Sequence, residues 1–335
     1  MTRQPPQLTF VIPCYNEAEV LPETLSLLLA LTQTLRAEGL VTDKSGVLII
    51  DDGSHDDSWA IITRFSSLDS RVSGIKLAGN AGHQKALLCG LLSAPGDALI
   101  SIDADLQDDL AAVRIMLNNF REGSDIVYGV RESRQADSRF KRISAETFYR
   151  ALAALGVKTV FNHADFRLMS RAAIEALRQF PERSIYLRGI MPLIGLPSSS
   201  VFYSRRVRQH GQTKYSLRKM AALATDAVTT MSVVPLRAVA ALGLLIFAGT
   251  SMSGIWVLGT RLLTDKAVPG WASTALPIYF LGGIQLLCLG VIGEYLGKIY
   301  IEVKRRPPFL IEATTPADFS PGYRKTTDFR ADVST

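Results

Sequence analysis

Short apolar runs alternate with helix-like stretches along the first part of the chain. The runs have the length of buried strands, and they lie at 8–14, 47–50, 72–77, 98–102 and 125–130. Between them apolar residues recur at helical spacing, over 20–31, 57–65 and 109–121. Strands that alternate with helices in this way predict an α/β domain with a mostly parallel sheet covered by helices on both faces.

Polar clusters directly follow four of these predicted strands. The clusters are Tyr15-Asn16-Glu17, Asp51-Asp52, Asn80 to Lys85, and Asp103 to Gln107. The carboxyl ends of parallel strands meet at one edge of a sheet, and ligands bind at that edge in folds of this class. We therefore expect the four clusters to form a single binding edge.

The cluster from Asp103 to Gln107 is the strongest candidate for chemistry. Asp103, Asp105 and Gln107 offer carboxylate and amide oxygens, which are ligands that suit Mg²⁺ or Mn²⁺. The alternative is a polar turn that ends the strand, with Asp109 starting the next helix. The chain has neither Gly-x-Gly-x-x-Gly nor Gly-x-x-x-x-Gly-Lys-Ser/Thr, so the charge of a bound diphosphate would have to be neutralised by a metal and basic side chains.

Two long uncharged stretches in the second half of the chain are typical of membrane spans. They cover 238–260 and 267–293, which are 23 and 27 residues, and each exceeds the roughly 20 residues that cross a bilayer. Two buried core helices are the alternative, and a weaker one at these lengths. The amphipathic stretch 216–233 predicts a helix on the membrane surface or, alternatively, a core helix of the preceding domain.

The distribution of charge predicts the orientation of this hairpin. The net charge is +6, and basic residues gather before the first span and after the second, while the loop between them holds one Arg and one Lys beside Asp265. The positive-inside rule then places both long arms in the cytoplasm. We expect a cytoplasmic α/β domain over 1–214, juxtamembrane helices over 215–235, a transmembrane hairpin over 236–297 and a cytoplasmic tail over 298–335.

Composition argues against several other classes of protein. No basic surface interleaved with aromatic residues is evident, so a nucleic-acid partner is not predicted, and the basic flanks of the spans suit anionic lipid headgroups. The three cysteines are widely separated, which predicts free thiols and no metal site built from them. The first eight residues are polar and Pro-rich, so no cleavable signal peptide is predicted.

Several motifs together resemble one known family. They are Val11 to Glu17, Asp51 to Ser54, Asp103 to Gln107, Asp165 to Ser170, Gly211 to Tyr215 and Gly293 to Tyr300. In order and spacing they resemble glycosyltransferase family 2, and within it the membrane-bound polyprenyl-phosphate glycosyltransferases, up to about Phe309. These enzymes include bactoprenol glucosyltransferases, dolichol-phosphate mannose synthases and aminoarabinose transferases, and the segment Asp165 to Ser170 is most similar to the first branch. The Gln-x-x-Arg-Trp motif of processive synthases is absent, which favours a single transfer.

The resemblance implies a GT-A (Rossmann-like) catalytic domain and a set of donor-site residues. Contacts to the nucleotide sugar are implied for Pro13, Tyr15, Glu17, Asp51, Asp103, Ala104, Arg208 and Lys214. Asp105 would hold Mg²⁺ or Mn²⁺ directly, and Asp103 and Gln107 would complete the protein side of the metal site. His83 is either a contact to the donor phosphates or a polar loop residue.

The resemblance also implies residues for the acceptor and for catalysis. Arg131, with Arg139 or Arg142 and Ser144, would hold an acceptor phosphate, since Arg makes bidentate phosphate contacts. A solvated basic loop is the alternative. Asp165 is the candidate for a general base or a positioning residue, and a structural carboxylate that pairs with Arg167 is equally consistent with the sequence.

The reaction implied is inverting transfer of one hexose, glucose from UDP-glucose, to undecaprenyl phosphate. It would take place at the cytoplasmic face of a bacterial inner membrane, catalysed by a multi-pass protein that forms a homotetramer. Alternatives keep the fold and change the donor to UDP-GlcNAc, GDP-mannose or a modified pentose. A non-catalytic membrane scaffold is a further alternative, and the intact Asp103, Asp105 and Gln107 argue against it.

Overall fold

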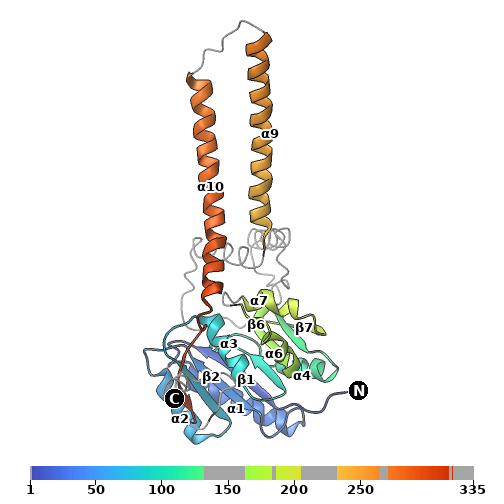
Figure 1. Ribbon diagram of the computed structural model, residues 1–335. Coiled ribbons are helices and arrows are strands. Elements are labelled where there is room, and N and C mark those ends of the chain that lie inside the picture. The colour runs from blue at the N-terminus through green and yellow to red at the C-terminus, as the bar shows by residue number, and fades with distance from the viewer. Residues whose placement is uncertain are drawn as a thin grey trace, which may run out of the picture. The chain divides into compact units, whose positions relative to one another are not determined.

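The computed structural model describes residues 2–131, 163–182, 186–204, 232–263, 271–316 and 319. The described residues form two compact units. The first contains 2–131, 163–204 without 183–185, and the described residues from 306 onward. The second contains 232–263 and 271–305. Each unit is considered by itself below (Figure 1).

The first unit is built around four parallel strands at the centre of an eight-stranded sheet. These strands are β1 (Leu8–Cys14), β2 (Gly46–Asp51), β3 (Val72–Leu77) and β4 (Ala98–Ser101), and they lie in the order β3-β2-β1-β4. The helices that connect them are α1 (Leu21–Ala37), α2 (Ser58–Leu68) and α3 (His83–Ser93). The predicted α/β fold is therefore confirmed, with predicted strand ends within one residue of those observed.

The other half of the sheet adds a reversed strand to the mostly parallel arrangement that the sequence predicts. Strand β6 (His163–Ser170) runs antiparallel between β4 and β5 (Ile126–Arg131), and β7 (Ser198–Tyr203) lies parallel to β5 at the outer edge. The sheet is mixed because β6 enters it in the reverse direction, with Ser170 opposite Ala98. Strand β6 is hard to recognise in the sequence because its buried positions include the charged residues Asp165 and Arg167.

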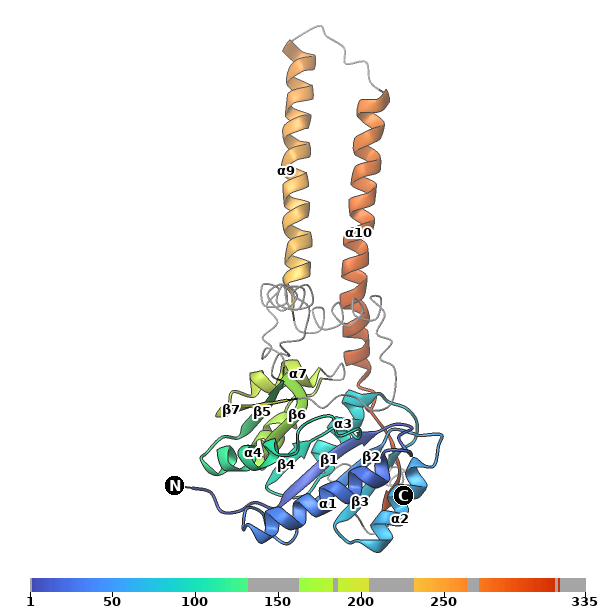
Figure 2. The ribbon, with the colours of Figure 1, turned by 180° about the vertical axis from the view of Figure 1, so that it is seen from behind.

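Both faces of the sheet are covered, as the pattern predicts. Helices α1, α2 and α4 (Ala112–Arg121) contribute to one large apolar cluster with strand residues such as Phe10 and Ile12. Helix α3 packs on the opposite face of β1 and β2, where Gly90 meets Val11 and Ile50, and a Cβ at Gly90 would lie 2.4 Å from both side chains. In Figure 2 α1 and α2 lie in front of the strands.

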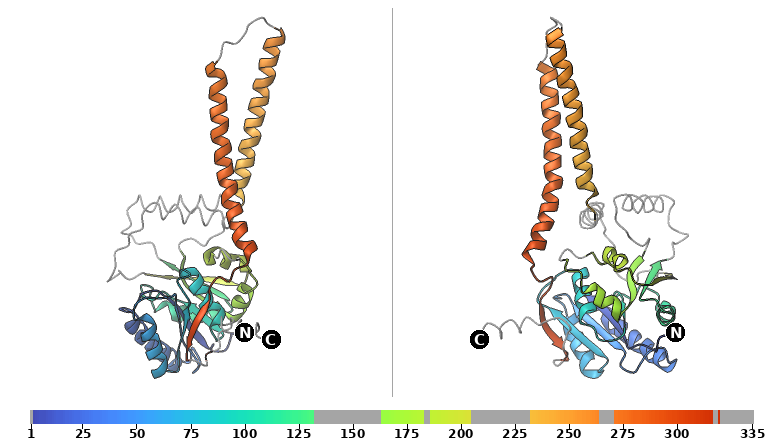
Figure 3. Two further views of the ribbon diagram at one scale, coloured as in Figure 1. Left: turned by 60° about the vertical axis from the view of Figure 1, so that its left-hand side comes forward. Right: turned by 45° about the vertical axis from the view of Figure 1, so that its right-hand side comes forward.

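A strand from the C-terminal part of the chain completes the sheet. Strand β8 (Ile311–Thr315) pairs antiparallel with β3, and Lys76 Nζ lies 3.0 Å from Glu312 Oε1 across the pair. Figure 3 shows this red strand beside the strands from the beginning of the chain. The residues of β8 form no continuous apolar run, so the sequence predicts only a cytoplasmic tail over 298–335, whereas this segment is a strand of the sheet.

The pairing of β8 with β3 can be tested by truncating Ile311, a buried side chain of β8. Ile311 is 3% exposed, and Ile311→Ala is expected to lower the free energy of unfolding by about 2 kcal/mol, because truncation leaves a cavity. Leu310→Ala is the matched control, since its neighbouring side chain is 44% exposed and its truncation should cost under about 0.5 kcal/mol. Urea unfolding in detergent measures both variants, and equal losses would contradict the assignment.

The second unit contains two long helices. They are α9 (Val234–Leu263) and α10 (Trp271–Lys304), the latter with Pro277 inside it. The hydroxyl of Tyr295 donates a hydrogen bond of 2.6 Å to the carbonyl oxygen of Ser232, so the two helices are joined near the start of α9. Among the described residues one helical segment, Phe280–Lys304, is long and apolar enough to cross a membrane, and it is not buried within the protein; Val234–Ile246 is apolar but shorter.

Short helices complete the first unit between β6 and β7. Helix α6 (Arg171–Leu177) begins at Ser170, whose Oγ accepts a hydrogen bond of 3.1 Å from the backbone N–H of Ala173 and so caps the helix. Helix α7 (Leu187–Ile190) leads directly into the 3₁₀ helix η1 (Met191–Ile194). Helix α7 carries Arg188, which belongs to the candidate site.

Candidate active site

The candidate site lies where the strand order changes direction. Strand β1 is flanked by β2 on one side and β4 on the other, while the chain runs from β1 outward through β2 and β3 before it returns to β4. In open α/β sheets ligands bind at such a switch point, outside the carboxyl ends of the strands. Tyr15 follows β1, Asp51 ends β2 and Asp103 follows β4, so these predicted residues share one edge of the sheet.

Asp51 has an unusual environment at this edge. Its side chain is fully buried, and burial raises its pKa. Oδ1 accepts a hydrogen bond of 3.1 Å from the N–H of Ser54, but Oδ2 has no hydrogen-bond partner among the described residues. A buried oxygen without a partner is costly, so Oδ2 marks a position where a ligand N–H or O–H would be stabilising.

The other donor-site candidates near Asp51 are held by a network between two loops. The N–H of Glu17 donates to Ser58 Oγ at 3.0 Å, and Asn16, at φ 54°, accepts from the N–H of His55 at 2.8 Å. The ring of Tyr15 meets the His55 ring edge-on at 6.4 Å between centroids and is exposed. Pro13 lies within β1, opposite Ile50. An exposed aromatic ring beside the buried Asp51 is suited to contact a flat ligand such as a base.

The neighbouring Asp52 positions the loop before α3. Its two carboxylate oxygens accept hydrogen bonds from the N–H groups of Ala81 at 2.7 Å and Gly82 at 2.9 Å. Gly53 is in the left-handed region at φ 71°, and a Cβ there would lie 2.7 Å from the backbone of Gly79, so glycine is required. The loop after β2 therefore fixes the loop after β3, from which His83 and Gln84 project.

The loop from Asp103 to Gln107 contains a strained turn. Leu106 has φ 44°, a left-handed conformation that is unusual for a bulky residue, and its side chain packs against the apolar cluster. The turn brings Gln107 back onto Asp105, where Gln107 Nε2 donates to Asp105 Oδ2 at 2.6 Å. Ala104 is buried, and its carbonyl accepts from Thr24 Oγ1 at 2.6 Å, which anchors the loop to α1.

Asp103 is surrounded by other carboxylates. Burial raises its pKa, and the negative charges of Asp108, Asp165 and Asp105 raise it further, while His83 lowers it. A cation placed among these groups would relieve their mutual repulsion. In the described part of the chain no three His, Cys, Asp or Glu side chains are grouped so that they could hold a metal ion by themselves.

The residues present nevertheless fit a divalent cation completed by a ligand. Mg²⁺ is commonly held by one or two carboxylates together with substrate phosphates and water, rather than by a cage made only of protein. Asp103 and Asp105 supply two such carboxylates, both at least partly accessible. Gln107 is buried and supports Asp105 by a hydrogen bond, and its predicted role as a metal ligand stays a prediction.

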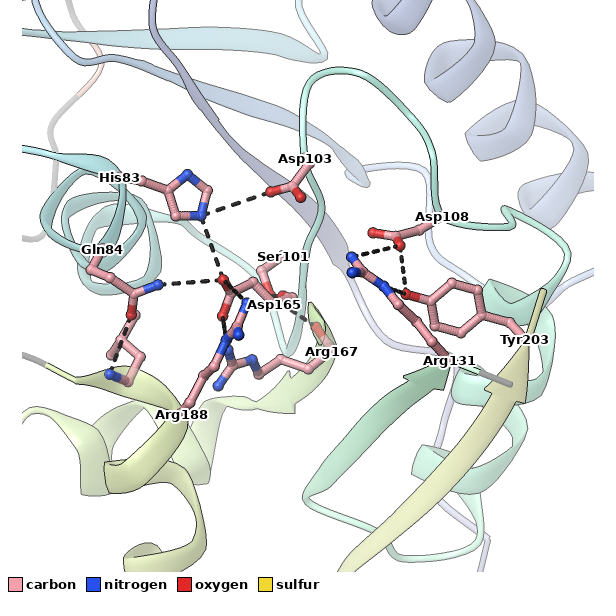
Figure 4. Close-up of polar contacts among 11 residues, drawn as sticks. His83, Gln84, Ser101, Asp103, Asp108, Arg131, Asp165, Arg167, Arg188 and Tyr203 are labelled. Carbon is pink, nitrogen blue, oxygen red and sulfur yellow. Dashed lines mark hydrogen bonds and ion pairs between the residues drawn. The ribbon is translucent and has the colours of Figure 1, made fainter. Parts of the chain in front are cut away.

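Asp165 is the centre of a second cluster, on β6. Arg167 Nη2 donates to Asp165 Oδ1 at 2.5 Å, and Arg188 of α7 donates from Nε to Oδ1 at 3.2 Å and from Nη2 to Oδ2 at 3.0 Å. Gln84 Nε2 donates to Oδ2 at 3.3 Å. His83 Nε2 lies 3.6 Å from Asp165 Oδ2 and 3.8 Å from Asp103 Oδ1, so it stands between the two carboxylates (Figure 4).

These neighbours determine the proton affinity of Asp165. Burial alone would raise its pKa, but His83, Arg167 and Arg188 together lower the pKa far below the usual range. Arg167 is 1% exposed, its pKa is lowered by burial, and its Nε and Nη1 have no partner among the described residues. The predicted pairing with Arg167 is present. A carboxylate held in this way is a weak proton acceptor, which disfavours the general-base role.

Arg131 belongs to a third cluster, on the other side of the Asp103 loop (Figure 4). It ends β5, and its Nε donates to Tyr203 Oη at 3.2 Å, while Nη2 lies 3.5 Å from Asp108 Oδ1. Tyr203 in turn donates to Asp108 Oδ1 at 2.5 Å. Burial and the charge of Asp108 raise the pKa of Tyr203, so its hydroxyl stays protonated and remains a donor.

The structure brings only part of the predicted site together. Asp103, Asp105, Gln107, Asp165 and Arg131 converge, whereas other predicted residues lie outside the described ranges, namely Arg139, Arg142, Ser144, Arg208 and Lys214. Sequence reasoning missed Asp108, Arg188 and Tyr203, whereas Gln84 lies in the predicted polar cluster from Asn80 to Lys85 but was given no role of its own. Asp108 directly follows the metal-like motif and could have been included, but Tyr203 and Arg188 lie in segments without any distinctive pattern.

The sheet therefore carries paired carboxylates at its switch point, with arginines on either side. Residues 9–178 match Glycosyl transferase family 2, and the chain belongs to that family. The expected resemblance is thereby confirmed.

Known relatives cover almost the whole chain. The chain is 46% identical over 314 residues to the glycosyltransferase YkoT of Bacillus subtilis (strain 168), covering 93% of each protein. It is 35% identical over 308 residues to the prophage bactoprenol glucosyl transferase homolog of Escherichia coli (strain K12), covering 91% of this chain and 98% of the relative. Among solved structures, the mannosyltransferase PcManGT of Pyrobaculum calidifontis, in complex with GDP-Man and Mn²⁺, aligns with a TM-score of 0.42 and 16% identity over 87% of each chain.

Proposed function

We propose that this glycosyltransferase moves one hexose, glucose from UDP-glucose, onto undecaprenyl phosphate or a similar polyprenyl phosphate. The observation that carries the proposal is the position of the Asp103 loop between Arg131 on one side and the Asp165 cluster on the other. A charged donor and a charged acceptor could meet there. Relatives named bactoprenol glucosyl transferase, 35% identical over most of the chain, support glucose and a lipid acceptor.

The nucleotide part of the donor would bind at the ends of β1 and β2. The unpartnered Oδ2 of the buried Asp51 would accept a hydrogen bond from the base, and the exposed Tyr15 ring would stack beside it. Pro13, Glu17 and Ala104 line the same edge and stay predictions for this role. Arg208 and Lys214, outside the described residues, stay predictions for contacts to the diphosphate.

Mg²⁺ or Mn²⁺ is proposed at Asp103 and Asp105, with Gln107 holding Asp105 in place. When bound, such a cation stabilises the negative charge that develops on the departing diphosphate. Asp103 and Asp105 provide the oxygens, and packing of Leu106 against the apolar cluster anchors the turn that carries them.

The acceptor phosphate is proposed to bind at Arg131, together with Arg139, Arg142 and Ser144 of the segment outside the described residues. A phosphate monoester has its second pKa near 6, so at pH 7 it is already an anion and needs little help from a base. Asp165, which is held by Arg167 and Arg188, then acts as a positioning residue that keeps His83 and Arg188 beside the Asp103 loop.

A membrane location follows from the same proposal. The exposed apolar helix Phe280–Lys304 would span the inner membrane, and α9 would supply the second span of the predicted hairpin, with the catalytic unit in the cytoplasm. Such an anchor would keep the active site close to the headgroup of a lipid acceptor. A homotetramer formed through the membrane part stays part of the proposal.

One assay tests the proposal. Purified protein in detergent, with a short polyprenyl phosphate and a panel of nucleotide sugars, should release nucleoside diphosphate fastest with UDP-glucose and only when Mg²⁺ or Mn²⁺ is present. Faster turnover with UDP-GlcNAc, GDP-mannose or a modified pentose donor would keep the reaction and replace the sugar. No lipid-dependent turnover with any donor would refute the reaction itself and favour a non-catalytic scaffold.

A further inference from the structure

Tyr203 and Asp108 surround the guanidinium of Arg131 but have no assigned part in the reaction. Both are almost fully buried, with Asp108 3% and Tyr203 4% exposed, whereas 27% of the Arg131 side chain is exposed. A buried carboxylate and a buried phenol at a catalytic edge are expensive to place, because each must keep its polar atoms bonded. Here both are directed at one arginine.

Strand geometry explains how Tyr203 reaches Arg131. In the parallel pair of β5 and β7, Arg131 and Tyr203 are register partners at the ends of their strands. Their side chains meet, since Arg131 Nε donates a hydrogen bond of 3.2 Å to Tyr203 Oη. The Tyr203 ring packs edge-on against Phe166 at 5.3 Å between centroids and lies over Gly129, where a Cβ would be 3.1 Å from Tyr203 Cε1. Gly129 and Phe166 therefore fix the ring, and with it the hydroxyl.

Asp108 links this arginine to the loop of the proposed donor site. It lies directly after Gln107, so its position depends on the turn that places Asp103 and Asp105. Its Oδ1 accepts from Tyr203 and faces Arg131 Nη2 at the same time. A change in the Asp103 loop would therefore move Asp108 Oδ1 and, with it, the guanidinium of Arg131.

We infer that Tyr203 and Asp108 are positioning residues that hold Arg131 in the orientation in which it binds the acceptor phosphate, at a set distance from the Asp103 loop. The inference rests on the proposed function, since it assigns Arg131 to the acceptor. The two buried partners hold the guanidinium from the protein side, while 27% of the Arg131 side chain is exposed. An arginine without these contacts would sample many rotamers, and ordering it on binding would weaken affinity.

The test is a comparison of Michaelis constants in Tyr203→Phe. This variant keeps the ring against Phe166 and removes only the hydroxyl. We expect the KM for a short polyprenyl phosphate to rise about tenfold, the effect of losing a hydrogen bond to a charged group, with the KM for the nucleotide sugar unchanged. Ser199→Ala is the matched control: it lies on the same strand and loses a 3.0 Å hydrogen bond from Asn119, but it does not touch Arg131.

A double-mutant cycle separates positioning from general structure. In an Arg131→Lys background Tyr203→Phe should change the lipid KM little, because the geometry that it maintains is already lost, and Asp108→Asn should behave in the same way. The inference would be overturned if Tyr203→Phe raised the lipid KM equally in the wild-type and Arg131→Lys backgrounds. It would also be overturned if Tyr203→Phe raised the KM for the lipid and the KM for the nucleotide sugar equally. An unchanged lipid KM in Tyr203→Phe would overturn it as well.

The outcome also distinguishes this inference from the proposed function. If Arg131→Ala weakens the use of polyprenyl phosphate but Tyr203→Phe does not, only the positioning role fails. If Arg131→Ala leaves the lipid KM unchanged, the acceptor assignment of Arg131 fails, and the positioning role fails with it. If the wild-type protein neither binds nor glycosylates the short polyprenyl phosphate, the proposed function itself is refuted.

Discussion

Asp105→Ala is expected to lower kcat/KM for transfer by about 100- to 1,000-fold, the loss found when an electrostatic contribution to a developing charge is removed. Asp105 is partly exposed and accepts hydrogen bonds from Gln107 of the same turn, so the variant should fold normally. The measurement is the initial rate of nucleoside diphosphate release at saturating Mg²⁺ or Mn²⁺. An undiminished rate would remove Asp105 from the proposed metal site.

A binding measurement makes this prediction independent of turnover. Mn²⁺ should bind to the wild-type protein in the presence of UDP with an affinity at least about tenfold higher than to Asp105→Ala, the range found when a group that supports a metal site is removed. Asp109→Ala is the matched control, because it removes a carboxylate from the same loop whose Oδ1 accepts only a local hydrogen bond, from the N–H of Ala111 at 3.0 Å. Equal Mn²⁺ affinity in wild type and Asp105→Ala would contradict the assignment.

The first four strands could be predicted because their sequences are largely apolar, with Ser73 and Lys76 as the polar positions of β3. Strands β1, β2 and β4 are buried on both faces, so every position has to be hydrophobic or small and the run stands out between polar loops. The polar clusters are equally visible, because each begins where a buried run ends. The fold class and the position of the binding edge follow directly from these two patterns.

Strands β6 and β8 could not be predicted for two different physical reasons. In β6 the buried positions include Asp165 and Arg167, which satisfy each other, and no sequence rule distinguishes a paired charge from a solvated one. In β8 the strand is an edge held by β3 and by Lys76, so few of its side chains need to be apolar. Both strands depend on partners that are distant in the chain.

The same reasoning explains which site residues were missed. Asp103 and Asp105 belong to a short motif at the end of a predicted strand, and together with the polar clusters at three other strand ends this motif indicates chemistry. Tyr203 and Arg188 act through partners that the fold brings to them, Arg131 and Asp165 respectively, and a lone Tyr or Arg has no local signature. Their contribution becomes visible only when the register of β5 with β7 and the position of α7 are known.

Asp165→Asn is expected to lower the free energy of unfolding by about 3–5 kcal/mol at pH 7, because it leaves the buried Arg167 without its anionic partner. Asp125→Asn is the matched control: its ion pair with Arg3, at 3.0 Å, has a partly exposed arginine and should contribute about 1 kcal/mol or less. Urea unfolding in detergent measures both. Adding Arg167→Met to Asp165→Asn should restore part of the lost stability, since no buried charge is then left unpaired.

The pH dependence of this variant follows from the direction of the pKa shift. The pKa of Asp165 is lowered in the folded state, so its contribution is complete above the pKa of an unfolded Asp, about 4, and is lost as the pH falls from there toward the folded-state value. The stability difference between wild type and Asp165→Asn should therefore shrink below about pH 4. Above that range it should grow as His83 becomes protonated, because Asp165 raises the pKa of His83. A difference that grows as the pH falls below about 4 would reverse the sign and refute the ion-pair account. Stability unchanged at pH 7 with transfer abolished would instead restore Asp165 as a general base, a role that its cationic neighbours now oppose.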